Sequence, residues 1–171
     1  LKHHGLYDNT LILFMSDHGD FAGDYALPEK THFSLQDCLL RVPFIIRTPT
    51  EWGGRSGVRN HLVELVDMCP TIYDLLGIDP DYDTQGLSLQ ASLGGDDSEI
   101  RHCVFAEVGA RSGEEAFINR EVESMPKDSF YALQSKASWE AHESGSYAVM
   151  ARSQDYKYVR RGYSPLHELY D

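Results

Sequence analysis

The sequence predicts an α/β fold that becomes α+β toward its end, and three patterns carry this prediction. Residues 10–15 form a short apolar run followed at once by polar residues, as a core strand does where it leaves a sheet. Residues 67–77 combine a capping Asp67, a first-turn proline, an apolar stripe and a final glycine, which predicts a helix. Residues 147–152 and 156–160 read as strands separated by three residues, which favours an antiparallel hairpin.

The other elements follow from the same kind of pattern. Residues 34–40 have a helical start capped by Ser34, and residues 42–47 and 103–108 are short strand patterns. Residues 79–97 are rich in Asp, Gly and Ser, which predicts a long surface connection. We therefore expect residues 1–95 to belong to an α/β core and residues 96–171 to form a small α+β subdomain.

Composition limits the classes of partner. The 171 residues fit one domain or one large piece of a bigger one. With 27 acidic and 15 basic residues the net charge is −12, which opposes binding to nucleic acid. The sequence has no apolar stretch of about 18 residues for a membrane span, and its start lacks a signal-peptide pattern, so localisation stays open. No Cys-x-x-Cys pair occurs, and the three cysteines are interpreted as buried or partly buried thiols: Cys38, Cys69 and Cys103.

The turn after the first strand pattern carries the most chemistry. Residues 16–20 read Ser-Asp-His-Gly-Asp, so that Asp17 and His18 could offer an oxygen and a nitrogen to a metal ion. The alternative is a solvated turn in which Asp17 caps backbone amides. Residues 21–33 form a loop in which Lys30 and His32 could face an anion, although a surface position is the ordinary expectation for a single lysine.

Several blocks of sequence, taken in order, carry a family resemblance. They are residues 8–20, Gly23-Asp24 with Lys30, and residues 41–47, 66–78, 85–89, 156–158 and 168–171. In this order they resemble the later third of type I sulfatases, which belong to the alkaline-phosphatase-like superfamily. The resemblance covers nearly the whole chain except roughly residues 109–145. It implies the C-terminal part of an alkaline-phosphatase-like sandwich, ending in a small antiparallel sheet with a helix.

The resemblance also implies roles for individual residues. Asp17 and His18 match two ligands of a divalent cation, with Ca²⁺ favoured and Mg²⁺ or Mn²⁺ as alternatives. Lys30 matches the lysine that contacts the sulfate and the catalytic residue, so it is both a catalytic and a substrate-binding candidate. His32 and Tyr25 are further substrate-binding candidates, and Tyr25 could equally pack beside the loop. The implied substrate is a small-molecule sulfate ester.

One departure from the family pattern bears on activity. Type I sulfatases use a formylglycine made from Cys or Ser in a Cys/Ser-x-Pro-x-Arg motif, and none of the three cysteines has that context. The family places this motif and two further Asp ligands upstream. We therefore expect a C-terminal fragment that is inert alone and needs the rest of the same polypeptide. A phosphonate or phosphate ester hydrolase of the same superfamily is one alternative, and a non-catalytic interaction module is another.

Overall fold

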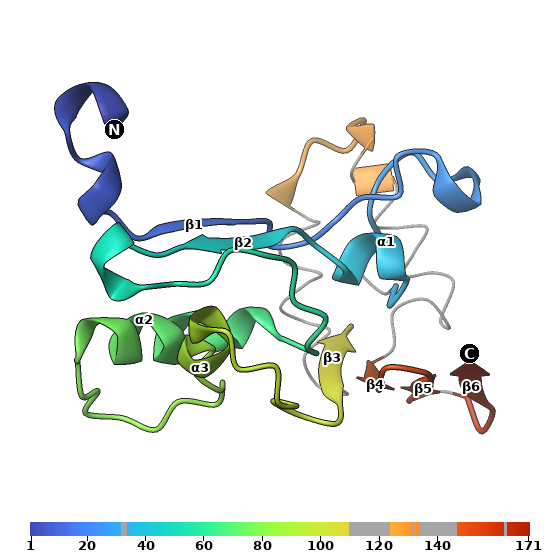
Figure 1. Ribbon diagram of the computed structural model, residues 1–171. Coiled ribbons are helices and arrows are strands. Elements are labelled where there is room, and N and C mark those ends of the chain that lie inside the picture. Colours follow the sequence, from blue (N-terminus) through green and yellow to red (C-terminus); the bar gives the residue numbers. More distant parts are fainter. Residues whose placement is uncertain (32–33, 110–123, 131, 134–146, 163) are drawn as a thin grey trace. The chain divides into compact units, whose positions relative to one another are not determined.

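The computed structural model describes the chain except for residues 32–33, 110–123, 131, 134–146 and 163 (Figure 1). The chain divides into two compact units. The first comprises Leu1–Gly19 and Arg41–Val104, and the second comprises Asp20–Leu40 and Phe105–Asp171. The division into residues 1–95 and residues 96–171, which the sequence suggests, stays a prediction.

The first unit contains a two-stranded antiparallel sheet. Strand β1 (Ile12–Met15) pairs with β2 (Phe44–Arg47). Both strands were predicted from their apolar runs, but their pairing was not. Phe14 and Ile45 lie opposite each other in the register, and their exposed fractions are 62% and 59%. The expectation that the first strand is buried is therefore wrong. Within the described part of the chain β1 pairs only with β2, and so small a sheet leaves this pair in solvent.

Arg47 fixes the entry into β1. Its guanidinium donates hydrogen bonds to the backbone carbonyls of Tyr7 and, at 2.9 Å, Thr10, and it forms a 3.5 Å ion pair with Asp8. The same guanidinium lies 4.0 Å from the centre of the Tyr7 ring, a cation–π contact. The last residue of β2 thus holds the segment that leads into β1.

The first unit also contains two α-helices. The predicted helix is confirmed as α2 (Met68–Leu76), which ends where Gly77 takes a left-handed conformation with φ 64°. Cys69 is exposed in its first turn, so the expectation of buried or partly buried thiols holds only for the other two cysteines. A further short helix, α3 (Gln90–Gly94), was not predicted. Its glycine and serine content made it look like part of the surface connection.

The second unit is built on a four-stranded sheet in the order β3-β4-β5-β6. Strands β4 (Ala148–Arg152) and β5 (Lys157–Arg161) pair antiparallel, which confirms the predicted hairpin. Strand β3 (Val104–Val108) also agrees with its sequence pattern. The strand β6 (His167–Tyr170), which pairs antiparallel with β5, was not predicted as a strand.

One face of this sheet carries the core of the second unit. Leu35 packs there with Ala148, Met150 and Val159, and all four are at most 4% exposed. The helix α1 (Asp37–Leu40) begins two residues after Leu35. The segment 20–40 is thus anchored to the sheet by one buried leucine and the helix that follows it.

Asp37 adds an ionic anchor at the start of α1. Its carboxylate accepts hydrogen bonds from Arg152 at 2.5 Å and Lys157 at 2.9 Å. Burial alone would raise the pKa of Asp37, but the hydrogen bond and charge of Lys157, together with Arg152, outweigh it and keep this pKa below its ordinary value.

This pKa leads to a prediction for acid stability. A carboxyl with a lowered folded pKa stabilises the protein above its unfolded pKa of about 3.9, and this contribution is lost as the pH falls through the folded pKa. The free energy of unfolding of Asp37→Asn should therefore lie below that of the wild type from about pH 7 to 5, with the difference shrinking below about pH 4. Urea unfolding at stepped pH values measures the difference. Asp155→Asn, in the β4–β5 hairpin, is the exposed control, and a difference that grows in acid would contradict the assignment.

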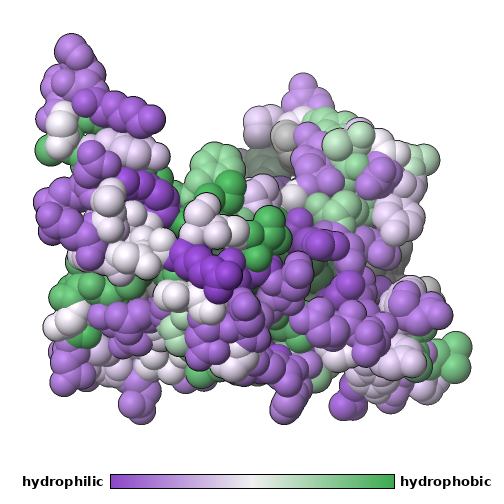
Figure 2. Space-filling model, in the orientation of Figure 1, coloured by the Kyte–Doolittle hydropathy of each residue, from purple (hydrophilic) through white to green (hydrophobic). Residues whose placement is uncertain are grey.

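The surface is mixed in character. On the face drawn in Figure 2, hydrophobic side chains lie in separate groups among hydrophilic ones. Large exposed hydrophobic residues come from both units, and they include Phe14, Ile45, Phe105 and Leu169. Among the described residues, no helix combines the length and apolar character that crossing a membrane requires.

Candidate functional site

The turn after β1 is closed by its own side chains. The hydroxyl of Ser16 donates a hydrogen bond to the carbonyl of His18 at 2.7 Å. The backbone N–H of His18 donates to Oδ1 of Asp17 at 2.9 Å. These two bonds close the turn, and neither of them involves Oδ2 of Asp17.

The ring of His18 is oriented by Gly19. Its Nδ1 lies 2.7 Å from the carbonyl oxygen of Gly19, and because a carbonyl only accepts, Nδ1 carries the proton. The other ring nitrogen, Nε2, lies 3.8 Å from Oδ2 of Asp17. Metal-binding histidines commonly donate their second N–H to such a carbonyl. The structure thus brings the two predicted metal ligands together.

The two donor atoms fit a hard divalent cation. Atoms 3.8 Å apart can both reach one cation at bond lengths of about 2.1–2.5 Å, and a carboxylate oxygen with an imidazole nitrogen suits Ca²⁺, Mg²⁺ or Mn²⁺. The Asp17 side chain is 86% exposed and that of His18 is 42% exposed. The described residues contain no group of three or more His, Cys, Asp or Glu side chains that could hold a metal ion. The pair therefore supplies part of a coordination shell, and its metal role stays a prediction.

Two of the predicted substrate-binding residues lie in the loop that opens the second unit. Tyr25 is 69% exposed, within a short 3₁₀ turn (Asp24–Ala26). Lys30 is exposed five residues further on. His32 lies outside the described residues. The loop thus presents an aromatic ring and an ammonium group on one short stretch of chain.

The sequence did not point to the residues that shape the turn around Asp17 and His18. Ser16 closes the turn through the carbonyl of His18, and Gly19 sets the ring orientation through its own carbonyl. The only signal for Ser16 was its type, since serine hydroxyls often bond to backbone two residues on. Gly19 contributes a backbone atom, and no sequence pattern points to that contact.

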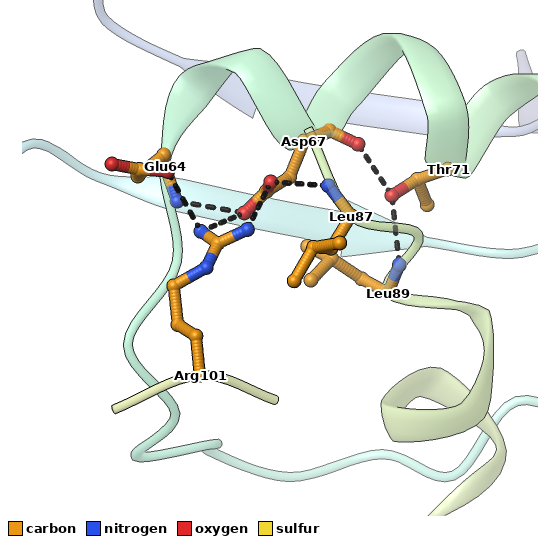
Figure 3. Close-up of polar contacts among 6 residues, drawn as sticks. All are labelled: Glu64, Asp67, Thr71, Leu87, Leu89 and Arg101. Atoms are coloured by element: carbon orange, nitrogen blue, oxygen red, sulfur yellow. Dashed lines mark hydrogen bonds and ion pairs between the residues drawn. The ribbon is translucent and has the colours of Figure 1, made fainter. Parts of the chain in front are cut away.

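A buried carboxylate near α2 is structural (Figure 3). Asp67 is fully buried, and its two oxygens accept hydrogen bonds from Arg101 at 2.6 and 2.7 Å. The same oxygens accept from the backbone N–H groups of Glu64 and Leu87, each at 2.8 Å. The hydrogen bonds from Arg101 to Asp67 raise the pKa of Arg101 above its ordinary value, so the guanidinium stays charged. Because each oxygen of Asp67 accepts two hydrogen bonds, we interpret Asp67 as a structural group.

Thr71 extends this cluster by one helical turn (Figure 3). Its hydroxyl donates to the carbonyl of Asp67 at 2.6 Å and accepts from the N–H of Leu89 at 3.0 Å. Both Thr71 and Leu89 are buried. Asp67 and Thr71 together thus fix residues 87–89 against the start of α2.

Comparison with solved structures identifies the fold. The whole chain aligns with 30% of the phosphonate monoester hydrolase of Agrobacterium radiobacter, with a TM-score of 0.71 and 29% sequence identity. The predicted fold class is therefore confirmed, because the chain carries part of an alkaline-phosphatase-like fold.

Comparison of sequences then shows which proteins with that fold the chain resembles. Residues 1–78 match the model of the sulfatase family. The chain is 33% identical over 95 residues to a delta 4,5-hexuronate-2-O-sulfatase of Bacteroides thetaiotaomicron, over 55% of this chain and 20% of that protein. It is 36% identical over 92 residues to an arylsulfatase of Clostridium perfringens, over 53% of this chain and 19% of that protein. The resemblance to type I sulfatases is thereby confirmed, and the match spans about a fifth of each of these two relatives.

Proposed function

We propose that the full-length protein that carries this chain is a metal-dependent sulfuric ester hydrolase. One observation carries the proposal: Oδ2 of Asp17 and Nε2 of His18 lie 3.8 Å apart, and the backbone carbonyl of Gly19 orients the imidazole. The match to the sulfatase family, over residues 1–78, contains this pair and Lys30.

Each of these residues has a distinct part in the proposed reaction. When bound, a divalent cation would polarise the sulfate oxygens and offset their charge. Asp17 contributes a negative oxygen to that cation, and His18 contributes a neutral nitrogen held in one tautomer. The ammonium of Lys30 binds a sulfate oxygen and stabilises the charge that develops as the ester bond breaks. We propose further that this chain alone is inactive, since none of its three cysteines lies in the nucleophile motif.

The choice between sulfate and phosphonate esters is the first test. The likeness to the Agrobacterium phosphonate monoester hydrolase makes that activity the second candidate. We expect the full-length protein to hydrolyse 4-nitrophenyl sulfate with a kcat/KM roughly tenfold or more above that for 4-nitrophenyl phenylphosphonate. Protein stripped of metal by a chelator is the control. A clear preference for the phosphonate would contradict the proposal, and turnover of neither ester would favour a non-catalytic module.

A further inference from the structure

Two cations of the second unit's sheet share one carboxylate. Arg152, at the end of β4, and Lys157, at the start of β5, lie directly opposite each other in the hairpin register. Like charges in such a cross-strand pair repel, so an anion between them stabilises the hairpin. Asp37 is that anion, because its carboxylate accepts hydrogen bonds from Arg152 at 2.5 Å and from Lys157 at 2.9 Å. The side chain of Lys157 is only 10% exposed, so the loss of this partner would leave a nearly buried charge poorly compensated.

The carboxylate comes from a segment that is distant in sequence. Residues 20–40 lie between the two stretches of chain that make up the first unit, yet they belong to the second unit. Leu35 is 2% exposed and packs in the core of the sheet with Met150 and Val159. Packing at Leu35 and charge at Asp37 therefore attach the last part of this segment to strands β4 and β5.

The first part of the segment is closed on itself. The N–H of Gly23 donates to the carbonyl of Leu27 at 2.9 Å, and Phe21 is only 3% exposed. Lys30, the predicted sulfate contact, follows Leu27 by three residues and precedes Leu35 by five. Because each residue adds at most about 3.6 Å of chain, the backbone of Lys30 stays within about 18 Å of Leu35. The place of Lys30 is thus limited by a closed turn on one side and by the sheet on the other.

We propose that Asp37, through its ion pairs with Arg152 and Lys157, positions Lys30 for the sulfate ester. This inference rests on the proposed function. The three residues act through the short chain that joins Asp37 to Lys30, so they are positioning residues and need not touch the substrate. A misplacement of about 1 Å that arises far from the reacting atoms can cost up to about 10²-fold in rate, which makes such an anchor matter for activity.

A double-mutant cycle on the full-length protein tests whether Asp37 acts through Lys30. The measured quantity is kcat/KM for 4-nitrophenyl sulfate. Asp37→Asn should lower it by about tenfold in protein that has Lys30, and by less than about twofold in Lys30→Ala protein, because an absent lysine cannot be misplaced. Equal losses in the two backgrounds would mean that Asp37 acts on the fold as a whole, and they would overturn the inference. Wild-type kcat/KM in Asp37→Asn would overturn it too.

The matched control is Glu168→Gln, which also converts an ion-paired carboxylate of this unit into an amide. Glu168 accepts a 2.5 Å hydrogen bond from Arg161, and both residues of that pair belong to the sheet. Its kcat/KM should stay within about twofold of the wild type. A loss equal to that of Asp37→Asn would overturn the inference and leave the proposed function standing.

A second variant keeps the test independent of how well Asp37→Asn folds. Arg152→Gln removes a single partner of Asp37 whose side chain is 34% exposed, and it leaves Lys157 in place. It should give the same non-additive pattern with Lys30→Ala and a smaller loss, and additive losses would count against the inference in the same way. A wild-type protein that hydrolyses no sulfate ester, or full activity of Lys30→Ala, would overturn the proposed function as well.

Discussion

Replacing Asp67 with asparagine is expected to lower the free energy of unfolding by about 3 kcal/mol, because it leaves the buried guanidinium of Arg101 with only one carboxylate partner, Glu64 at 3.1 Å. The carboxylate is fully buried, and the side chain of its partner Arg101 is only 10% exposed. The amide keeps the shape of the side chain but loses its charge, and it turns an N–H group toward a guanidinium or a backbone donor. The contacts to Glu64 and Leu87 weaken with it, so the start of α2 and the segment after residue 86 are both affected.

Urea unfolding of the full-length protein measures this effect. Asp97→Asn is the matched control, since it removes the same charge at an exposed position in the same unit. Its free energy of unfolding should stay within about 0.5 kcal/mol of the wild type. A loss for Asp67→Asn as small as that of the control would show that the cluster in Figure 3 does not hold the unit together.

Replacing Asp17 with alanine is expected to reduce the hydrolysis of 4-nitrophenyl sulfate by the full-length protein at least about 10²-fold. The change removes the carboxylate that we propose as a metal ligand, so that only the imidazole of His18 remains of the pair. Added Ca²⁺ should restore little activity. Asp155→Ala is the control, and it should retain wild-type activity because this exposed carboxylate lies in the β4–β5 hairpin. Full activity in Asp17→Ala would remove this residue from the proposed mechanism.

Local sequence patterns predicted the elements whose signals lie within their own residues. The α2 helix has its first-turn proline, apolar stripe and final glycine within about ten residues, although the predicted cap is wrong because the Asp67 side chain makes no cap hydrogen bond to the helix. The β4–β5 hairpin has its turn between two short strands. The strand β6 is different, because its pairing with β5 and not its own sequence makes it a strand. The exposure of Phe14 also depends on which elements pack around β1, and a strand pattern carries no information about them.

The features of the candidate site also differ in how far the sequence could predict them. The roles given to Asp17, His18 and Lys30 come from their types and order through the family resemblance, and they stay predictions. The orientation of the His18 ring depends on a backbone carbonyl, which sequence does not reveal.

Calorimetric titration of Ca²⁺ into metal-stripped full-length protein tests the central claim most directly. The account predicts saturable binding by the wild type and by Asp155→Ala. Binding by Asp17→Ala should be weaker by about tenfold or more, because a hard cation loses its charged oxygen ligand from this pair. Calcium binding by Asp17→Ala that equals the wild type would contradict the assignment of the turn after β1 as a metal site.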